Sequence, residues 1–439
     1  MNSVLKYTIF AWLLRIESVG RFYTSLKMRI ALLPKFRTHL IIFLIISIDS
    51  AAQFPISLNQ AIDSAIKNNL TIQNENLKSD YAKVLIKSAT VIPSTNITSE
   101  MGQINSAYFD TKVGISQNLS FPTVYSKQKQ LYTEEWKATL WSASLKKAEL
   151  KRMVSETFYN YLFWKEKQTL LKNLDTIYST LLEKASLRLQ KGESNILEKT
   201  TFETQQSAIS MQLSLVQQEI KVLENNFQLL LNTRFPYFPA KICFKYPELN
   251  FENWQNAVPN HPSLLLVQQQ VEIAKATTHT EQAKLLPDLI LGYTNTSMKG
   301  LGADDRLYGA SHRFHIAQIG VGIPLFATSQ KARIKASIIN EQINQNNYQI
   351  EKAGLYAKIN SVFEQYQRQK NVVRLYEIQY LKNIKIINKT AEKQLQNGEI
   401  NYLDLVMLIN QTSNIQSSYL NDVHLLNQSA IQLEYLLNL

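Results

Sequence analysis

Residues 189–198, LQKGESNILE, return as residues 395–404, LQNGEINYLD, with six of the ten residues identical. Other landmarks repeat in the same way: Phe121, Phe158, Tyr161 and the run 230–232 correspond to Phe326, Phe363, Tyr366 and the run 436–438. The offset at each of these landmarks is 205 or 206 positions. A constant offset over separated landmarks indicates a tandem duplication, so each half of the chain is expected to build the same unit.

Each copy shows the same order of structural signals. A phrase Ala-x-apolar-apolar-Pro stands at 89–93 and again at 283–287. It closes a helix of about 25 residues, because the residue before proline avoids the α region. Two β-like segments follow in each copy. We place them at 95–106 and 112–119 in the first copy and at 289–297 and 316–323 in the second, with loops at 107–111 and 298–315.

A very long helix comes next, at about 124–191 in the first copy and 327–397 in the second. Some 70 helical residues would reach roughly 100 Å, far beyond an ordinary globular helix. Apolar residues three and four positions apart predict a coiled-coil seam. These are Leu171, Leu174, Tyr178, Leu181 and Ala185, and then Tyr380, Ile384, Ile387 and Ala391. Gly192 and Gly398 then reverse the chain into a returning helix of about 38 residues.

The front of the chain is typical of a secretory signal. Arg29, Lys35 and Arg37 precede a nine-residue apolar run at 40–48, and Ser50 and Ala52 occupy the −3 and −1 positions of a cleavage site before Gln53. Met28 offers an alternative start, which would leave residues 1–27 untranslated. A retained anchor is the other interpretation, but the run is shorter than the roughly 20 residues of a spanning helix.

These features divide the chain into a signal peptide at 1–52, a first repeat at 53–232, a linker at 233–262 and a second repeat at 263–439. The linker holds five of the eleven prolines and is expected to be irregular. It also holds Cys243, the single cysteine, which excludes an intramolecular disulfide. We interpret Cys243 as a small buried hydrophobe.

Several function classes are disfavoured by the composition and the motifs. The net charge is +12, but residues 1–52 carry seven basic and two acidic residues, so removing them leaves +7. The remaining basic residues are spread out, which disfavours nucleic-acid binding. No nucleophile–base constellation, phosphate loop or HExxH motif is present, so we expect neither an enzyme nor a cofactor. The pair His312 and His315, with Asp304 and Asp305 nearby, is too weak a pattern to predict a metal site.

The β-like segments point to a channel. Beyond Gln53 no stretch of about 18 apolar residues occurs, so a membrane-spanning mature chain would need a closed β-barrel. Each segment has about ten residues, enough to cross a bilayer core when tilted, and 318–323 alternates apolar with small or polar residues. One four-stranded sheet would leave two unpaired edges in lipid. Three chains giving four strands each would close a twelve-stranded barrel, which predicts a homotrimer.

Together, the signal peptide, the duplication, the proline phrase, the strand pairs, the long helices and the Gly-Glu turns resemble the TolC-type outer-membrane efflux family. The resemblance covers roughly residues 56–438. It implies a mainly α protomer that gives four strands to a trimeric barrel in the bacterial outer membrane and its long helices to a periplasmic α-barrel. The order of features is most similar to the heavy-metal and multidrug efflux branch, although the lipid-modified cysteine of many members is missing here.

The resemblance also implies a passive conduit with two partners besides its own copies. An inner-membrane pump, of the resistance-nodulation-division type or a secretion ATPase, would deliver substrates through a periplasmic adaptor protein. Adaptor contacts are expected at the turns. The residues concerned are Arg188, Leu189, Gly192, Glu193 and Ser194 in the first repeat, and Leu395, Gly398 and Glu399 in the second.

The pore gate is expected on the second repeat. In the family pattern, aspartates that ring the pore follow the tip glycine by six and nine positions. Here Gly398 is followed by Asp404 and then by Met407, which puts the second acidic ring in doubt. Helix capping alone is an alternative role for Asp404, because Asn401 and Asp404 have capping-box spacing, as do Asn195 and Glu198.

A different function class remains open at this stage, namely a secreted coiled-coil scaffold or adhesin without a barrel. Long amphipathic helices alone would suit such a protein. The four β-like segments and their loops favour the channel.

The cleavage-site spacing generates the first prediction. The mature protein should begin at Gln53 without lipid modification, because Ser50 and Ala52 fit the signal-peptidase pockets. N-terminal sequencing of the purified protein measures this directly. Finding residues 1–27 on the mature protein would contradict the expected processing.

Overall fold

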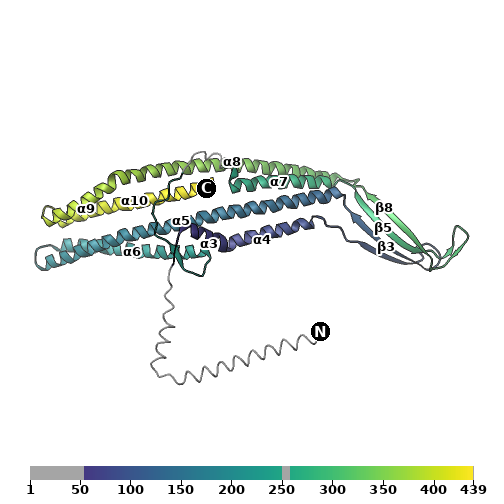
Figure 1. Ribbon diagram of the computed structural model, residues 1–439, viewed down its shortest axis with the longest axis horizontal. Helices are drawn as coiled ribbons and strands as arrows, with labels where there is room; N and C mark the ends of the chain where they lie inside the picture. The colour runs from purple at the N-terminus through teal and green to yellow at the C-terminus, as the bar shows by residue number, and fades with distance from the viewer. Residues whose placement is uncertain (1–53, 250–257, 439) are drawn as a thin grey trace, which may run out of the picture. The chain divides into compact units, whose positions relative to one another are not determined.

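The computed structural model describes residues 54–249 and 258–438. The predicted signal peptide, its cleavage site and residues 250–257 of the predicted linker lie outside the described residues. Long helices make up most of the described chain, and a sheet stands at one end of them (Figure 1). None of the described helices is apolar enough over a sufficient length to cross a membrane.

The first repeat follows the expected order with one difference. Its elements are β1 (Phe54–Ile56), α3 (Leu58–Asn68), α4 (Leu70–Leu85), η1 (Ile86–Ala89), β2 (Asn96–Gly102), β3 (Asp110–Leu119), α5 (Pro122–Gln190) and α6 (Ile196–Leu231). The prediction of a single helix before Pro93 is wrong, because Asn69 has an extended backbone that divides the segment into two helices. The Asn69 side chain accepts the backbone N–H of Thr71 at 2.9 Å and donates to the carbonyl of Leu230 at 3.1 Å. Asn69 therefore ends one helix and caps the next.

The second repeat differs from the expectation at two places. Its elements are α7 (Pro262–Ala283), β5 (Asp288–Ser297), β6 (Gly300–Leu301), β7 (Leu307–Tyr308), β8 (Arg313–Gly322), α8 (Thr328–Leu375), η4 (Tyr376–Tyr380), α9 (Leu381–Gln396) and α10 (Tyr402–Leu437), and the short helix η3 (Val258–Asn260) precedes them in the linker. The loop expected at 298–315 contains the small β6–β7 hairpin, and β8 already begins at Arg313. The expected long helix is helical throughout but passes through a π-helical turn, η4.

The larger sheet joins the two repeats. Its order is β2-β3-β5-β8, and every neighbouring pair is antiparallel. The central pair, β3 with β5, places Lys112 opposite Thr296 and Leu119 opposite Leu289. Strands β2 and β8 are therefore the two edges, and each comes from a different repeat.

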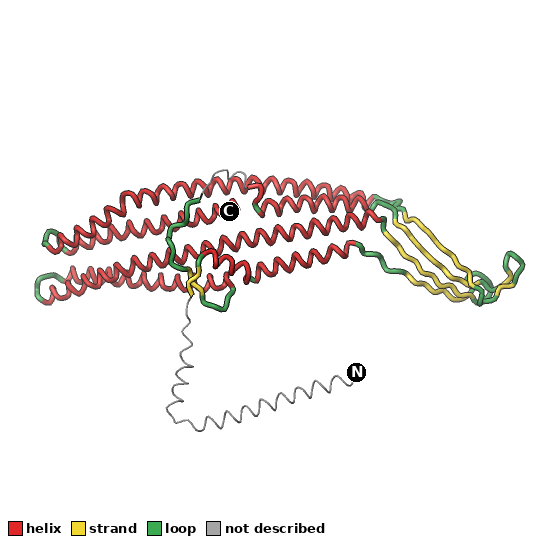
Figure 2. The backbone as a smooth tube through the Cα atoms, viewed as in Figure 1, coloured by secondary structure: helices red, strands yellow, loops and turns green. Residues whose placement is uncertain are grey.

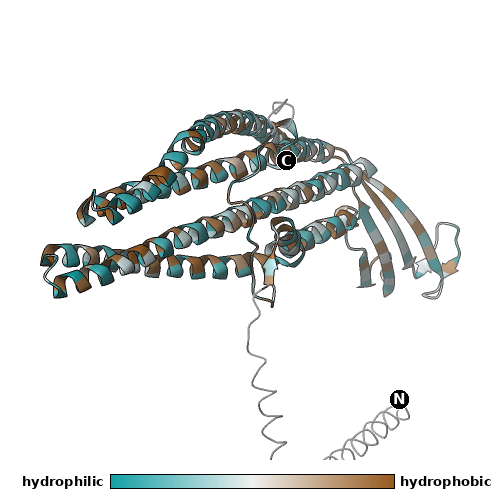
Figure 3. Cartoon of the chain, turned by 60° about the vertical axis from the view of Figure 1, so that its left-hand side comes forward, coloured by the Kyte–Doolittle hydropathy of each residue, from teal (hydrophilic) through white to brown (hydrophobic). Residues whose placement is uncertain are grey.

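The register gives this sheet two chemically different faces. Residues that lie opposite each other share a face, as Ile115 does with Ile97 and Tyr293. We call one the apolar face; it carries Ile97, Val113, Ile115, Leu119, Leu289, Leu291, Tyr293, Ala317, Ile319 and Val321. Its polar exceptions include Ser99, Gln117 and, at the end away from the helices, Thr111, Asn295, Arg313 and His315. The other, the polar face, carries Thr98, Glu100, Lys112, Gly114, Ser116, Gly292, Thr294, Gln318 and Gly320, with Ile290, Phe314 and Ile316 as apolar exceptions. Hydrophobic and hydrophilic residues accordingly alternate along the strands (Figure 3).

The helices pack as two hairpins, α5 with α6 and the α8–α9 run with α10. The predicted seam is confirmed in the first hairpin, where Leu171, Tyr178, Leu181 and Ala185 are buried and Leu174 packs beside them. In the second hairpin Ile384 and Ala391 are buried, whereas Tyr380 is 45% exposed. In each hairpin, side chains spaced three and four residues apart thus pack between the two helices, as in a coiled coil.

Residues 240–249, which we call the strap, lie against both repeats. The ring of Phe244 stacks 6.2 Å from that of Phe163, and the ring of Tyr246 lies 4.9 Å from that of Tyr159. The prediction that Cys243 is buried is wrong, because its side chain is exposed. The strap instead packs Phe244 and Tyr246 against the hydrophobic core.

Candidate functional site

The two glycine turns lie at the end of the helices opposite the larger sheet (Figure 2). Gly192 and Gly398 have φ values of +75° and +73°, as expected where only glycine avoids strain. In the first turn Glu193 donates its backbone N–H to the carbonyl of Arg188 at 2.9 Å. In the second, Glu399 donates to Gln394 at 2.8 Å. Both turns therefore close their helices with the same Schellman-type cap.

The returning helices begin differently in the two repeats. Asn401 and Asp404 form the expected capping box, with N–H to side-chain oxygen distances of 2.9 and 3.2 Å. In the first repeat Asn195 accepts the N–H of Glu198 at 3.0 Å, but the Glu198 carboxylate does not return the bond.

The Glu198 carboxylate is instead held by Arg188 at 3.0 Å and by the hydroxyl of Ser194. The expectation of a second capping box is therefore wrong. The two repeats differ because Arg188 attracts the Glu198 carboxylate away from the helix cap. The equivalent of Arg188 in the second repeat is Gln394, which is uncharged and leaves Asp404 in its capping box.

Tyr402 joins the two hairpin ends, a role that sequence reasoning missed. The Arg188 guanidinium lies over its ring at 4.6 Å, and the ring of Phe202 meets it edge-on at 6.2 Å. Further along the helices, the Tyr178 hydroxyl donates to Asn410 at 2.8 Å. A difference between the repeats could have indicated this role, since the residue equivalent to Tyr402 in the first repeat is Ile196, which is exposed.

The expected docking and gate residues lie at this same end of the bundle. At the turns, Gly192, Glu193, Gly398 and Glu399 are exposed, Leu189 is half-buried, and Leu395 packs against the first hairpin's core. Leu405 and Val406 are buried in that core as well. Asp404 is half-buried, and Met407 is 64% exposed. At the end of the second hairpin, Met407 therefore lies outside the hydrophobic contacts through which Leu405 and Val406 pack against the first hairpin.

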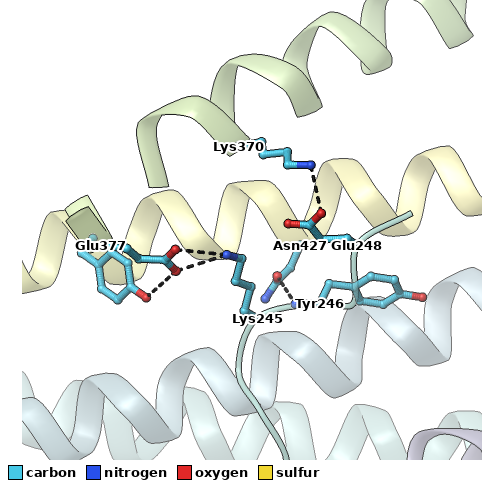
Figure 4. Close-up of polar contacts among 7 residues, drawn as sticks. Lys245, Tyr246, Glu248, Lys370, Glu377 and Asn427 are labelled. Carbon is cyan, nitrogen blue, oxygen red and sulfur yellow. Dashed lines mark hydrogen bonds and ion pairs between the residues drawn. The ribbon is translucent and has the colours of Figure 1, made fainter. Parts of the chain in front are cut away.

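The strap binds the second repeat at the π-helical turn (Figure 4). Lys245 reaches Glu377, inside that turn, at 3.2 Å, and the Tyr419 hydroxyl donates to the same carboxylate at 3.4 Å. Burial, and then the neighbouring Glu377 carboxylate, raise the pKa of Tyr419 to about 12, so the hydroxyl keeps its proton at neutral pH. The continuous α5 of the first repeat has no such turn.

Two more contacts fix the strap. The Asn427 side chain accepts the backbone N–H of Tyr246 at 2.8 Å and donates to the carbonyl of Phe244 at 2.6 Å. Lys370 pairs with Glu248 at 3.1 Å. The strap, which is part of the linker predicted to be irregular, is therefore ordered and is bonded to both α8 and α10.

The histidines and aspartates of the weak metal pattern are not brought together. His312 lies in the loop, but His315 lies in β8, beside the hydroxyl of Tyr293. The Asp304 carboxylate accepts the hydroxyl of Tyr308 at 2.7 Å. Within residues 54–249 and 258–438, no three or more potential ligands cluster as a metal site would require.

Comparison with known proteins gives a family match over the second repeat. Residues 253–439 match the model of the outer membrane efflux protein family, OEP. Comparison with the curated proteins gave no significant match.

Several solved structures share the fold over most of both chains. The crystal structure of CusC gives a TM-score of 0.72 at 16% identity, covering 88% of this chain and 93% of CusC. VceC of Vibrio cholerae gives 0.69 at 14% identity, covering 87% and 95%. The open-state MtrE channel of Neisseria gonorrhoeae gives 0.69 at 12% identity, covering 87% and 88%.

The second repeat thus matches the family model, and the described chain has the fold of outer-membrane channels. The resemblance to TolC-type proteins is confirmed. Residues 253–439 are thus similar to the outer membrane efflux protein family, whose members are channels and not enzymes.

Proposed function

We propose that this chain is one protomer of a homotrimeric outer-membrane duct whose helices extend into the periplasm. Removal of residues 1–52 leaves the two repeats, 53–232 and 263–439, joined by the linker 233–262. Substrates delivered by an inner-membrane pump, of the resistance-nodulation-division type or a secretion ATPase, pass through a periplasmic adaptor into this duct. The observation that carries the proposal is the two-faced sheet with two unpaired edges.

The sheet has the composition of a barrel wall. Its apolar face suits lipid, and its polar face, with the Glu100–Lys112 ion pair at 3.0 Å and several glycines, suits a watery lumen. Edge strands β2 and β8 would leave backbone groups unpaired in the hydrocarbon, at several kcal/mol for each group. Pairing β8 of one copy with β2 of the next satisfies both edges, and three copies give an even total of twelve strands. A secreted scaffold without a barrel would expose this apolar face to water, which is unfavourable.

The tips suit docking and gating. We propose that the adaptor contacts the exposed turns around Gly192 and Gly398, together with Arg188, Leu189, Glu193, Ser194, Leu395 and Glu399. The gate is formed by Asp404 and Met407 of three copies near the axis. Capping is compatible with a pore role for Asp404, because the capping bond uses one carboxylate oxygen, Oδ2, and leaves the negative charge in place.

The closure argument predicts a stable trimer. Protein extracted from membranes should have the mass of three mature chains in mild detergent, because fewer copies leave edges unpaired. A monodisperse monomer or dimer would contradict the barrel. Extraction also tests the scaffold alternative, since a scaffold is released by salt or urea whereas a barrel requires detergent.

The tip geometry predicts the effect of Gly398→Val. A Cβ at Gly398 meets no atom within 4 Å, so the cost comes from the left-handed backbone and is about 1–2 kcal/mol. We expect a distorted turn and loss of efflux, with trimer mass and outer-membrane insertion unchanged. Gly398→Asn is the matched control and should retain efflux, because asparagine accepts this conformation. Loss of insertion in Gly398→Val would instead make the turn a folding element.

The gate assignment predicts the effect of Asp404→Asn. Three carboxylates about 6–8 Å apart repel each other and attract cations, whereas asparagine keeps the capping oxygen and the size. In planar bilayers the mutant should lose cation preference and divalent block, with trimer stability nearly unchanged.

The matched control is Glu198→Gln, at the equivalent position of the first repeat. Glutamine can still accept from Arg188 and Ser194, so conductance should stay as in the wild type. If Asp404→Asn also conducts like the wild type, Asp404 is only a helix cap.

A further inference from the structure

A polar network crosses the apolar face at the end away from the helices. It consists of Thr111, Tyr293, Asn295, Arg313 and His315, from strands β3, β5 and β8. The register puts all five side chains on this one face. A connected polar network on the face that we assign to lipid requires an explanation beyond sheet packing.

Arg313 is the cation of the network, and its described partners are neutral. Its Nε donates to Asn295 Oδ1 at 2.5 Å, and its guanidinium also donates to Thr111 Oγ1 at 2.7 Å and to the Asn295 carbonyl at 3.3 Å. No carboxylate of the described chain lies within 4.0 Å of it. These bonds use three of the five guanidinium N–H donors and orient the planar group.

The carboxylate of Asp110, at the start of β3, is bound by other donors. Asp110 is fully buried, and its carboxylate accepts the hydroxyls of Ser106 and Ser297 and the backbone N–H groups of Asn105 and Lys299. Asp110 therefore has its own set of donors. The positive charge of Arg313 is left to be balanced from outside the described chain.

Tyr293 and His315 complete the site beside Arg313. The Tyr293 hydroxyl lies 2.5 Å from His315 Nδ1, and the Asn295 amide nitrogen lies 3.3 Å from the same atom. His315 and Tyr293 are both exposed. An aromatic ring with its polar end turned away from the apolar surface is typical of the boundary between lipid and water.

The register sets the depth of the site. Val321, next to the helices, and Arg313 are eight residues apart on β8, about 26 Å along a strand. With the tilt of barrel strands this is about 20 Å of height, close to the apolar band of about 25 Å. Between them lie Ile319 and Ala317 and then His315. Arg313 therefore lies where the hydrocarbon would end, on the side opposite the periplasmic helices.

We propose that Arg313, with Tyr293 and His315, binds the phosphate of an outer-leaflet lipid headgroup. The proposal rests on the proposed function, which supplies the membrane and its orientation. Guanidinium groups bind phosphate through charge-assisted N–H donors. Arg313 keeps two such donors, one on Nη1 and one on Nη2. Ile319, 81% exposed on the same face, provides apolar surface for the acyl chains below the headgroup. A lipid uses both surfaces, whereas free phosphate uses only the first.

Native mass spectrometry of the full mature trimer in detergent tests this site. The probes are a phosphorylated glycolipid, the same lipid with its phosphates removed, and inorganic phosphate. We expect up to one phosphorylated lipid per protomer, at least tenfold weaker binding of the dephosphorylated lipid, and no competition by millimolar inorganic phosphate. Arg313→Gln should weaken binding of the phosphorylated lipid by at least tenfold.

The matched control is Arg306→Gln. Arg306 lies beside the β6–β7 hairpin with 81% of its side chain exposed, and losing the same charge there should leave lipid binding unchanged. Should Arg313→Gln fail to assemble, Arg313→Lys keeps the charge without the fork and should bind more weakly than the wild type. The wild-type comparison of the two lipids needs no variant.

Equal binding of the two lipids, or of wild type and Arg313→Gln, overturns the proposal. Competition by inorganic phosphate overturns it as well, because it identifies a free-anion site. An acidic residue of a neighbouring copy that occupies Arg313 would abolish phosphate dependence and give the same contrary result. All these outcomes leave the trimeric duct intact, whereas absence of a trimer contradicts the proposed function itself.

Discussion

A backbone amide in hydrocarbon must find its partner within the protein, because no water is there to replace it. In the β2-β3-β5-β8 sheet, the backbone groups between neighbouring strands are paired, whereas those on the outer sides of β2 and β8 are not. In the duct that we propose, these edges are the reason why copies of the same chain are needed. This need also gives a reason for the duplication, since each repeat contributes one antiparallel pair and one edge, so that identical chains can close head to tail.

The two repeats share a plan but differ where their roles should differ. Arg188 holds Glu198 in the first tip, whereas Gln394 leaves Asp404 to its capping box in the second. The first long helix is unbroken, whereas the second contains a π-helical turn anchored by the strap through Lys245. Turns of this kind are frequent at functional sites and can redirect a helix. Such asymmetry is what a duplicated chain needs if one hairpin is to support the tube and the other to line it.

The sequence alone predicted the element order, the long helices and both glycine turns, because these depend on local periodicity and on a backbone that only glycine adopts without strain. It missed features that depend on distant partners. Asn69 breaks its helix while bonded to the Leu230 carbonyl, and Asn427 fixes a strap that looked irregular. The π-helical turn and Tyr402 fall in the same class, since ordinary helical spacing runs through both. Comparing the repeats position by position would have flagged Tyr402 and Arg188, because neither has a chemically similar equivalent.

Disulfide scanning between the sheet edges tests the central claim most directly. On a Cys243→Ser background, one cysteine would replace Gln318 on β8, and a second would be moved along 96–102 on β2 of the same chain. If β8 of one copy pairs with β2 of the next, oxidised outer membranes should give covalent dimers and trimers at cross-strand positions and not at their neighbours. Uncross-linked monomer at every position, in protein that is inserted in the membrane, would contradict closure by identical chains.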